Sequence, residues 1–491
     1  MPEDKTLLIR NLRGNWSARF LHEYFYRHNA ESSFYYLNLI KLEVFPPHKS
    51  APTFINAKFR EWITSQTCFK NPYPQAIEAS LKQGDVQFVN SSAIFSLRNY
   101  LTILSLFRVT NSQELDAFKV GDVPFGKFLH TTLISKYGVK HFDLTYLDHV
   151  LNFRLYRRFF YSYIKLSKTM NDLSITKIVL VNGRDIVGVA AQLCGFLKHV
   201  PIVTLEAGFG EASVPLYGEW NGNMHHWRVR QNELSKTIAR FPDYEGADEF
   251  IKKKYGHGSR WWKIGSTISS SKIELPDNFV CFFTTSERES TCCPTGNPGD
   301  NFFDEFDQVT QLLKVYKFAK SRNLPLIIRI HPNFSNSKSA KNELRFFENL
   351  TNEWEETTLI PNNSDLNSYT IANQAKFIFT FRSSLSAELS RLQIHCIQTA
   401  PTAWSQFSFE TLKTTDDQIM SINTPPRRPK TAGRRDWEAF AIYYALHGKN
   451  FESVSFVKVE IGSREKTVVL LEKLHGNLLD IPRFNKFPSR N

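Results

Sequence analysis

The segment RIHP, residues 329–332, places an arginine and a histidine at the end of an apolar run. Such a run is typical of a strand covered by helices on both faces, and ligands bind beyond the carboxyl ends of such strands. Arg329 and His331 can both donate to phosphate oxygens, and Pro332 fixes the chain that follows. These three residues are candidates for binding a phosphate-bearing ligand. The simpler alternative is a strand-end histidine bonded to a backbone carbonyl.

Hydroxyl-bearing residues follow two other apolar runs. Ser383 and Ser384 precede an expected helix, whose unpaired first N–H groups and positive dipole end would attract a phosphate. Glu388, one turn later, could accept hydrogen bonds from ribose hydroxyls. Thr284 and Ser286 end a third run, and the topology would bring all of these strand ends to one rim. The alternative for Ser383 or Ser384 is a plain helix N-cap.

A fourth candidate group lies earlier, in the segments VNGRD (181–185) and LEAGFG (205–210). Arg184 would project from a helix start, where we expect it to bind the nucleotide donor together with Thr284 and Ser286, and Glu206 would stand at the end of the next strand. A carboxylate there could act as general base for an incoming hydroxyl. Asn182 and Gly208 would then contact the acceptor. The alternative is an ion pair between Arg184 and Glu206 that only fixes the loops.

These residues require alternating strands and helices to position them. In the first half we expect strands at 7–10, 178–181 and 202–205, and helices at 19–28 (with Ser17 as N-cap), 146–170 and 186–197. In the second half we expect strands at 279–283, 326–330, 357–360, 377–381 and 395–398, helices at 303–321, 338–350, 366–373 and 384–392, and a last helix at 437–446. The strand–helix–strand unit at 178–205 predicts parallel pairing.

The 491 residues, 42% of them hydrophobic, are more than one core usually supports. We expect an α/β protein with an N-terminal Rossmann-like domain at 1–268 on the acceptor side and a donor-side Rossmann-like domain at 269–425. A basic loop and helix at 426–491 would pack back across them. The alternation is compatible with GT-B glycosyltransferases, whose two domains face a central cleft, and also with periplasmic binding proteins or epimerases.

Six scattered cysteines fit neither a zinc site nor a disulfide framework, so we expect thiols and no metal site. The N-terminus lacks a secretory signal, and no apolar run is long enough to span a bilayer. These features predict a cytoplasmic protein that could attach peripherally to the inner face of the plasma membrane. The net charge of +13 favours anionic partners.

In order and spacing, the motifs VLVNGR, IVTLEAGFG, FFTTSE, LIIRIHPN and FRSSLSAEL resemble the bacterial capsule and lipopolysaccharide glycosyltransferases of GT-B architecture. The resemblance covers roughly residues 175–400. The His-Pro pair and the serine-containing helix start are similar to the donor site of Kdo transferases and sialyltransferases. Their acidic pair before glycine is matched here by Glu206 and Gly208, with alanine between them.

The resemblance implies a glycosyltransferase that uses a nucleotide sugar as co-substrate, with no obligatory cofactor. A CMP-sugar such as CMP-Kdo or CMP-sialic acid is favoured, and UDP- or GDP-sugars stay open. The acceptor would be a bacterial surface glycan or a lipid-linked glycan. His331 and Pro332 would contact the nucleotide, and Ser383 and Ser384 its phosphate. Glu206 and His331 would be the catalytic residues.

Two other classes stay open. A sugar-nucleotide epimerase shares the two-domain plan. A nucleic-acid-binding protein would suit the positive charge, but the basic residues are dispersed and no nucleic-acid motif is present, so we expect no nucleic-acid partner. The basic segments at 154–160 and 427–435 could instead hold the protein on an anionic membrane or a polyanionic acceptor, or simply be solvated.

Overall fold

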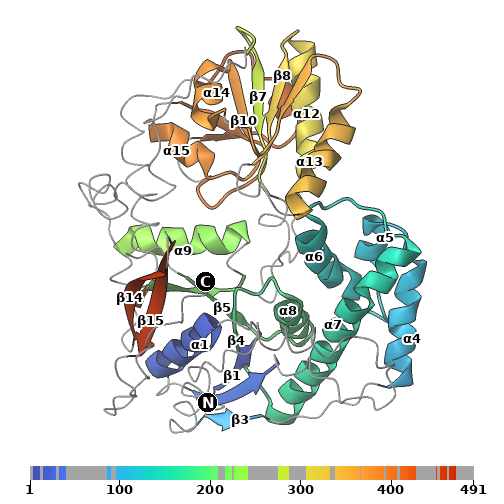
Figure 1. Ribbon diagram of the computed structural model, residues 1–491, viewed down its shortest axis with the longest axis vertical. Helices are drawn as coiled ribbons and strands as arrows, with labels where there is room; N and C mark the ends of the chain where they lie inside the picture. The colour runs from blue at the N-terminus through green and yellow to red at the C-terminus, as the bar shows by residue number, and fades with distance from the viewer. Residues whose placement is uncertain are drawn as a thin grey trace, which may run out of the picture.

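The computed structural model contains two mainly parallel sheets, each with helices packed against it (Figure 1). The residues that the structure describes are 4–11, 15–28, 32–39, 86–89, 96–207, 216–223, 226–240, 275–286, 306–331, 338–364, 366–391, 394–405, 410–426, 449–450, 454–461 and 464–471.

The first sheet has the strand order β13-β6-β5-β4-β1-β2-β3. Its strands are β1 (Lys5–Arg10), β2 (Ser33–Asn38), β3 (Gln87–Phe88), β4 (Lys177–Val181), β5 (Ile202–Ala207), β6 (Leu216–Asn221) and β13 (Lys449–Asn450). Strands β1 to β5 pair in parallel, whereas β6 and β13 form an antiparallel edge. A short segment near the C-terminus thus completes the sheet that the N-terminus begins.

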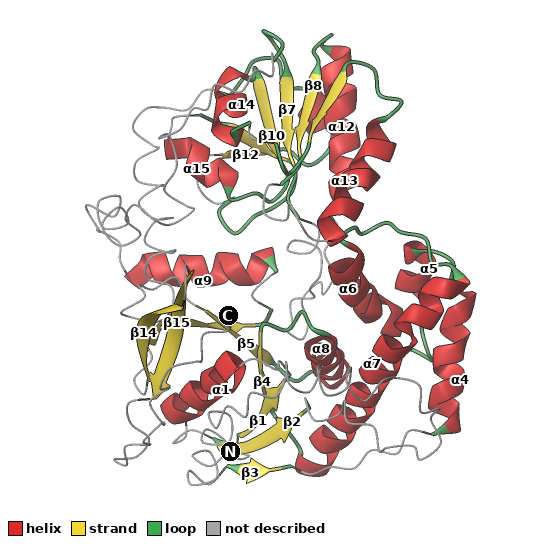
Figure 2. Ribbon diagram, viewed as in Figure 1, coloured by secondary structure: helices red, strands yellow, loops and turns green. Residues whose placement is uncertain are grey.

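Helices cover both faces of this sheet (Figure 2). They are α1 (Asn15–His28), α4 (Leu97–Ser105), α5 (Ser112–Ala117), α6 (Phe125–Tyr137), α7 (Tyr146–Leu173), α8 (Ile186–Lys198) and α9 (Trp227–Arg240), with a 3-10 turn, η2, at Leu106–Arg108. Alternate residues of β1 enter different cores, because strand side chains alternate between faces. Leu7 and Ile9 pack with α6, α7 and α8, whereas Leu8 packs with α1.

The second sheet is wholly parallel, with the order β12-β11-β10-β7-β8-β9. Its strands are β7 (Val280–Phe283), β8 (Leu326–Arg329), β9 (Thr357–Ile360), β10 (Phe377–Thr380), β11 (Cys396–Gln398) and β12 (Glu410–Leu412). Its helices are α12 (Gln308–Ser321), α13 (Lys338–Thr351), α14 (Ser368–Gln374), α15 (Leu385–Arg391) and α16 (Asp416–Met420). A separate hairpin pairs β14 (Val454–Ile461) with β15 (Arg464–Leu471).

The strand order confirms the predicted α/β fold with two Rossmann-like sheets. Renumbered from its own first strand, the second sheet has the order 6-5-4-1-2-3, and the parallel part of the first has 5-4-1-2-3. Both are the doubly wound pattern, in which the chain reverses direction across the sheet between the first and fourth strands. These switch points lie between β1 and β4 and between β7 and β10. Each one is where a ligand is expected.

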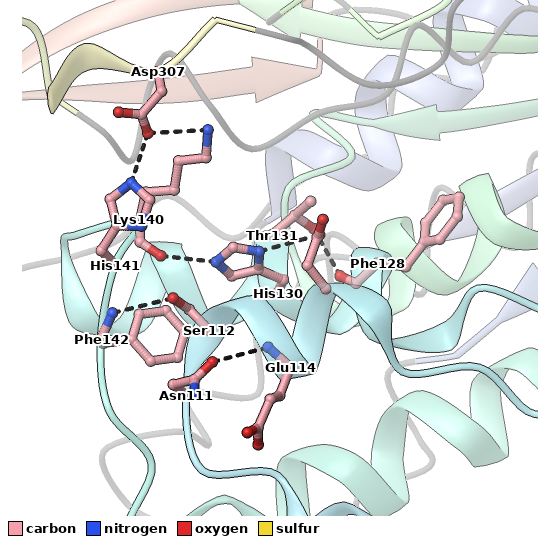
Figure 3. A network of polar contacts seen from close by, with 11 residues as sticks. Asn111, Ser112, Glu114, Phe128, His130, Thr131, Lys140, His141, Phe142 and Asp307 are labelled. Carbon is pink, nitrogen blue, oxygen red and sulfur yellow. Dashed lines mark hydrogen bonds and ion pairs between the residues drawn. The ribbon is translucent and has the colours of Figure 1, made fainter. Parts of the chain in front are cut away.

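An ion cluster joins the two parts of the chain (Figure 3). Oδ2 of Asp307, the N-cap of α12, lies 2.7 Å from Nε2 of His141 and 3.2 Å from Nζ of Lys140. Burial raises the pKa of Asp307, but the His141 hydrogen bond and the Lys140 charge outweigh it and hold the pKa below its usual value. Nearby, Asn342 donates to the carbonyl of Tyr137 at 3.1 Å. These contacts set the second sheet against the helices of the first.

The expected strands are confirmed to within one or two residues where they were predicted, and so is the parallel pairing of β4 with β5. Two helix starts were wrong. Helix α1 begins at Asn15, so Ser17 is inside it and is not its cap, and α12 begins at Gln308 after its Asp307 cap. The expected helix at 437–446 lies outside the described residues. The domain limits at 268 and 425 stay predictions.

Candidate functional site

The chain leaving β7 carries three hydroxyl residues that are all buried. Oγ1 of Thr284 accepts from the backbone N–H of His331 at 3.0 Å, which links the ends of β7 and β8. The backbone of Thr285 exchanges two hydrogen bonds with the side chain of Gln308, at the start of α12. Ser286 is 0% exposed, and its Oγ has no hydrogen-bond partner among the described residues. Thr284 and Thr285 therefore build the loop, whereas the Ser286 hydroxyl is left available.

Arg329, at the end of β8, is buried and faces the loop after β9. Its terminal nitrogens donate to the carbonyls of Pro361 and Ser364. Burial lowers the pKa of this guanidinium, which still remains charged at neutral pH. Its Nε has no partner within the described part of the chain. The side chain thus orders a neighbouring loop. His331, two residues further along the chain, is partly exposed.

The chain leaving β10 makes a strained turn. Arg382 has φ 51°, a left-handed conformation that is uncommon for a residue with a side chain. Its backbone N–H donates to Oε1 of the fully buried Gln398 at 3.1 Å. The Arg382 guanidinium lies 5.4 Å from the ring centre of Phe381 and 5.8 Å from that of Phe306. Gln398 thus fixes the turn that presents this arginine.

Ser383 and Ser384 start α15, but in different roles. Oγ of Ser383 accepts from the N–H of Leu385 at 3.2 Å, which is the N-cap alternative. Ser384 donates to Glu388 at 3.2 Å, and the same carboxylate accepts from the hydroxyl of Tyr369. Burial raises the pKa of Glu388, against these two hydrogen bonds, which lower it. Both carboxylate oxygens of Glu388 are therefore already hydrogen-bonded within the domain.

Across from β10, the residue before α9 is also buried. His226 is 4% exposed, and its Nδ1 accepts from the N–H of Arg228 at 3.3 Å. Burial, followed by the charges of Arg382 and Arg228, lowers the pKa of His226 to about 3. The imidazole is therefore neutral. Because Arg382 belongs to the second sheet and His226 to the chain leaving the first, positive charge from both parts converges here.

In the first sheet, the predicted group after β4 and β5 is brought together by Asn182. Its amide donates to the carboxylate of Glu206, and its Oδ1 accepts from Nε of Arg184 at 3.2 Å. Asn182 has φ 64° and is followed by Gly183 at 82°, a pair of left-handed residues that turns the chain sharply. Asn182 thus holds Arg184 and Glu206 on the same amide group.

The switch point of the first sheet is filled by the chain's own polar groups. Asn11, after β1, donates to the carbonyl of Val181 at 2.7 Å and to the Asp185 carboxylate. That carboxylate caps α8 by accepting from the N–H groups of Val187 and Gly188. Burial raises the pKa of Asp185, against the hydrogen bonds from Asn11 and the helix. An acceptor side chain therefore already occupies the anion-binding end of α8.

Pro332 and Gly208 lie outside the described residues, and so does the basic segment at 427–435. The sequence reasoning missed Arg382, His226 and Asn11, and also Thr380, the fully buried last residue of β10. Arg382 stood within the FRSS motif, so its position after an apolar run was a usable signal. His226 and Asn11 gave none, because their partners are far away in the sequence.

Among the described residues, no group of three or more metal-ligating side chains is found. The described helices include none that is both long and apolar enough to cross a membrane. The described cysteines, Cys194, Cys281 and Cys396, are buried and form no disulfide with one another.

No protein-family model matches the chain, and no curated protein matches it. Among solved structures, it is similar to the β-Kdo 2,7 transferase KpsC of Thermosulfurimonas dismutans, with 12% identity, coverage of 62% of this chain and 85% of that one, and a TM-score of 0.32. It is also similar to a glycosyltransferase of Rickettsia africae (8% identity, 91% and 95% covered, TM-score 0.25). A UDP-GlcNAc 2-epimerase of Methanocaldococcus jannaschii gives 9% identity, 88% and 97% coverage and a TM-score of 0.23. Because these scores are all below 0.5, the fold assignment rests on the strand order of the two sheets.

Proposed function

We propose that the chain is a glycosyltransferase that binds the phosphate of a nucleotide-activated sugar at the switch point between β7 and β10. One observation carries the proposal. Ser286 and Thr380 flank this switch point, both are 0% exposed, and neither hydroxyl has a hydrogen-bond partner among the described residues. A buried unsatisfied hydroxyl costs about 1–3 kcal/mol, and most buried polar groups are paired. Other buried hydroxyls, such as those of Thr132 and Ser162, also lack a partner, but Ser286 and Thr380 follow or end adjacent strands, where one ligand that accepts hydrogen bonds would satisfy both.

The local charge supports an anionic ligand. The positive charges of Arg382 and Arg228 both lower the pKa of His226 and so keep its imidazole neutral. A buried phosphate would compensate the charge of the two arginines. Arg382 is held in a strained turn by Gln398. Strain of this kind is found where a backbone or side chain must meet a ligand.

The contrast between the two switch points supports placing the phosphate in the second domain. Between β1 and β4, Asn11 and Asp185 satisfy each other, and the Asp185 carboxylate caps α8. An added phosphate would meet a competing acceptor there. Between β7 and β10, the cap of α15 is the neutral Ser383. The first domain is then left for the acceptor.

The predicted residues take the following roles in this proposal. Glu206, held by Asn182, is the general base that activates the acceptor hydroxyl, with Arg184 bonded to the same asparagine and Gly208 two residues further along the chain. His331 donates to the leaving phosphate from the rim, and Pro332 fixes the chain after it. Arg329 has a positioning role, because its terminal nitrogens are bonded to loop carbonyls.

The motif resemblance favours a CMP-sugar, such as CMP-Kdo or CMP-sialic acid, over a UDP- or GDP-sugar as donor. The same resemblance suggests a bacterial surface glycan, of capsule or lipopolysaccharide type, as acceptor. The reaction would take place at the cytoplasmic face of the membrane. The proposed ligands are a nucleotide sugar and a glycan, so the proposal includes no nucleic-acid partner.

The test is calorimetric titration with CMP, CDP, UDP and GDP, followed by transfer assays with sugars of the base that binds. Ser286→Ala should weaken nucleotide binding. Its control is Ser321→Ala, at the far end of α12, whose hydroxyl donates to the carbonyl of Phe318 at 2.8 Å. Equal nucleotide affinities for both variants would remove the proposed site. If the protein instead converts a UDP-sugar to its epimer in the absence of any acceptor, the proposed reaction is epimerisation and not glycosyl transfer.

A further inference from the structure

Two neighbouring helices of the first domain expose a concentration of large apolar side chains. We call this set the α4/α7 face, and it consists of Leu97, Tyr100, Leu101 and Leu104 on α4 and Tyr146, Leu147, Val150 and Leu151 on α7. Their exposed fractions run from 37% to 75%. The other large apolar residues this exposed within the described ranges are Leu313, Leu412 and Met420, which are scattered over the second domain.

The sequence spacing makes each helix apolar on its outer side. Residues three, four and seven apart share a face of a helix, and Leu97, Leu101 and Leu104 follow that spacing. The core side of α4 is supplied by Ile103, which is fully buried, and that of α7 by residues such as Tyr156. The exposed leucines are therefore additional to the core and do not contribute to it.

The two helices form one continuous surface. Phe107, in η2 directly after α4, has its ring centre 5.4 Å from that of Tyr146 and 5.2 Å from that of His149. His149 is anchored in turn by a 2.7 Å hydrogen bond between its Nε2 and the carbonyl of Val109. Figure 1 shows α4 and α7 together at the outer side of the first domain. A contiguous exposed apolar surface of this kind marks an interaction site.

Charge identifies the kind of partner. Arg98 on α4 and Arg154 on α7 are exposed beside the apolar residues, and Arg108 is exposed just after α4. Helix α4 has no acidic residue. In the first half of α7, the acidic residue is Asp148, whose carboxylate is used in the capping box with Thr145. The two helices therefore present an apolar surface with basic charges, and next to them Arg108 is accompanied by the exposed acidic residues Glu114 and Asp143.

We propose that the α4/α7 face binds the surface of an anionic phospholipid bilayer. The leucines would enter the boundary between head groups and acyl chains, and the arginines would contact the head-group phosphates. Pairing with a second copy would instead set these arginines against one another in a chain of net charge +13. The inference does not depend on the proposed nucleotide site.

The test is flotation of the full chain with vesicles of phosphatidylcholine alone or mixed with phosphatidylglycerol. We expect the wild type to float with the mixed vesicles and much less with the neutral ones. Leu101→Glu and Leu147→Glu should each lower the partition coefficient for the mixed vesicles about tenfold or more, because each removes one apolar side chain from the lipid. Arg98→Glu should reduce binding to the anionic vesicles only, and added salt should have the same effect.

Leu313→Glu is the matched control, because this leucine is 40% exposed on α12 in the second domain. It should bind vesicles like the wild type. All variants should keep the wild-type melting temperature, since the changed residues are exposed, and should keep nucleotide binding. Unaltered flotation of Leu101→Glu and Leu147→Glu would overturn the proposal. So would a wild-type dimer in sedimentation that Leu101→Glu dissociates and that does not bind vesicles.

Discussion

Replacing Thr380 by valine should stabilise the free protein while weakening nucleotide binding. Thr380 is 0% exposed, and its hydroxyl has no partner among the described residues. Valine has nearly the same shape and removes an unsatisfied polar group whose burial costs about 1–3 kcal/mol. We therefore expect a gain of about 1 kcal/mol or more. In a domain of this size, that is a rise of about 2–4 °C in the melting temperature.

Thr399→Val is the matched control for this experiment. Thr399 is also 0% exposed and lies just beyond the neighbouring strand β11, but its Oγ1 donates to the carbonyl of Thr380 at 3.1 Å. Losing that hydrogen bond should destabilise by about 0.5–1.5 kcal/mol. The assay is thermal unfolding of both variants, with and without nucleotide. Equal destabilisation by the two valines would refute the reasoning, as would a stabilised Thr380→Val that keeps full nucleotide affinity.

Three further outcomes are expected. His226 has a folded-state pKa of about 3, below its unfolded value, so the unfolded chain takes up the proton first and stability falls as the pH drops below about 6.5. Between pH 7.5 and 5.5, His226 should lower the wild type's free energy of unfolding by about 1.4 kcal/mol, and His226→Asn should lack this loss. Denaturant unfolding at both pH values measures the difference, and identical pH profiles for the two proteins would disprove it. Glu206→Gln should abolish sugar transfer and keep donor affinity in calorimetry, and loss of donor binding would instead make the carboxylate part of the donor site. His331→Ala should lower turnover far more than the melting temperature, whereas full activity at an unchanged melting temperature would remove His331 from the site.

The strands that were predicted could be recognised because buried parallel strands are continuous apolar runs, whereas β2, β3, β6 and β12 were not predicted. Segments such as 279–283 and 377–381 stand out for that reason, and the polar residues after them had to meet at one edge of the sheet. The helical block formed by α4, α5 and α6 was not predicted. In α4 the leucines at 97, 101 and 104 do follow a helical spacing, but they face outward and not into the core.

The finer contacts depend on pairs that are distant in the sequence. Asn11 and Val181 are 170 residues apart, and only the pairing of β1 with β4 brings them together. The charge of Arg382, which follows a strand of the second sheet, lowers the pKa of His226, which follows the first sheet. Arg329 was predicted to bind phosphate from its position at a strand end, whereas its terminal nitrogens bond the carbonyls of Pro361 and Ser364 and so position a loop. The residues next to Arg329 in the sequence do not indicate these distant carbonyls.

The most direct test of the central claim is the nucleotide affinity of Arg382→Ala compared with Arg322→Ala, by calorimetry. Both arginines lie over phenylalanine rings, at 5.4 Å from Phe381 and 5.6 Å from Phe318, but Arg322 is exposed at the end of α12, away from the switch point. If the phosphate binds between β7 and β10, Arg382→Ala should lose about tenfold or more in affinity, since a charge-assisted hydrogen bond is worth about 1.5–3 kcal/mol. Arg322→Ala should keep the wild-type affinity. Equal affinities for the two variants would contradict the account.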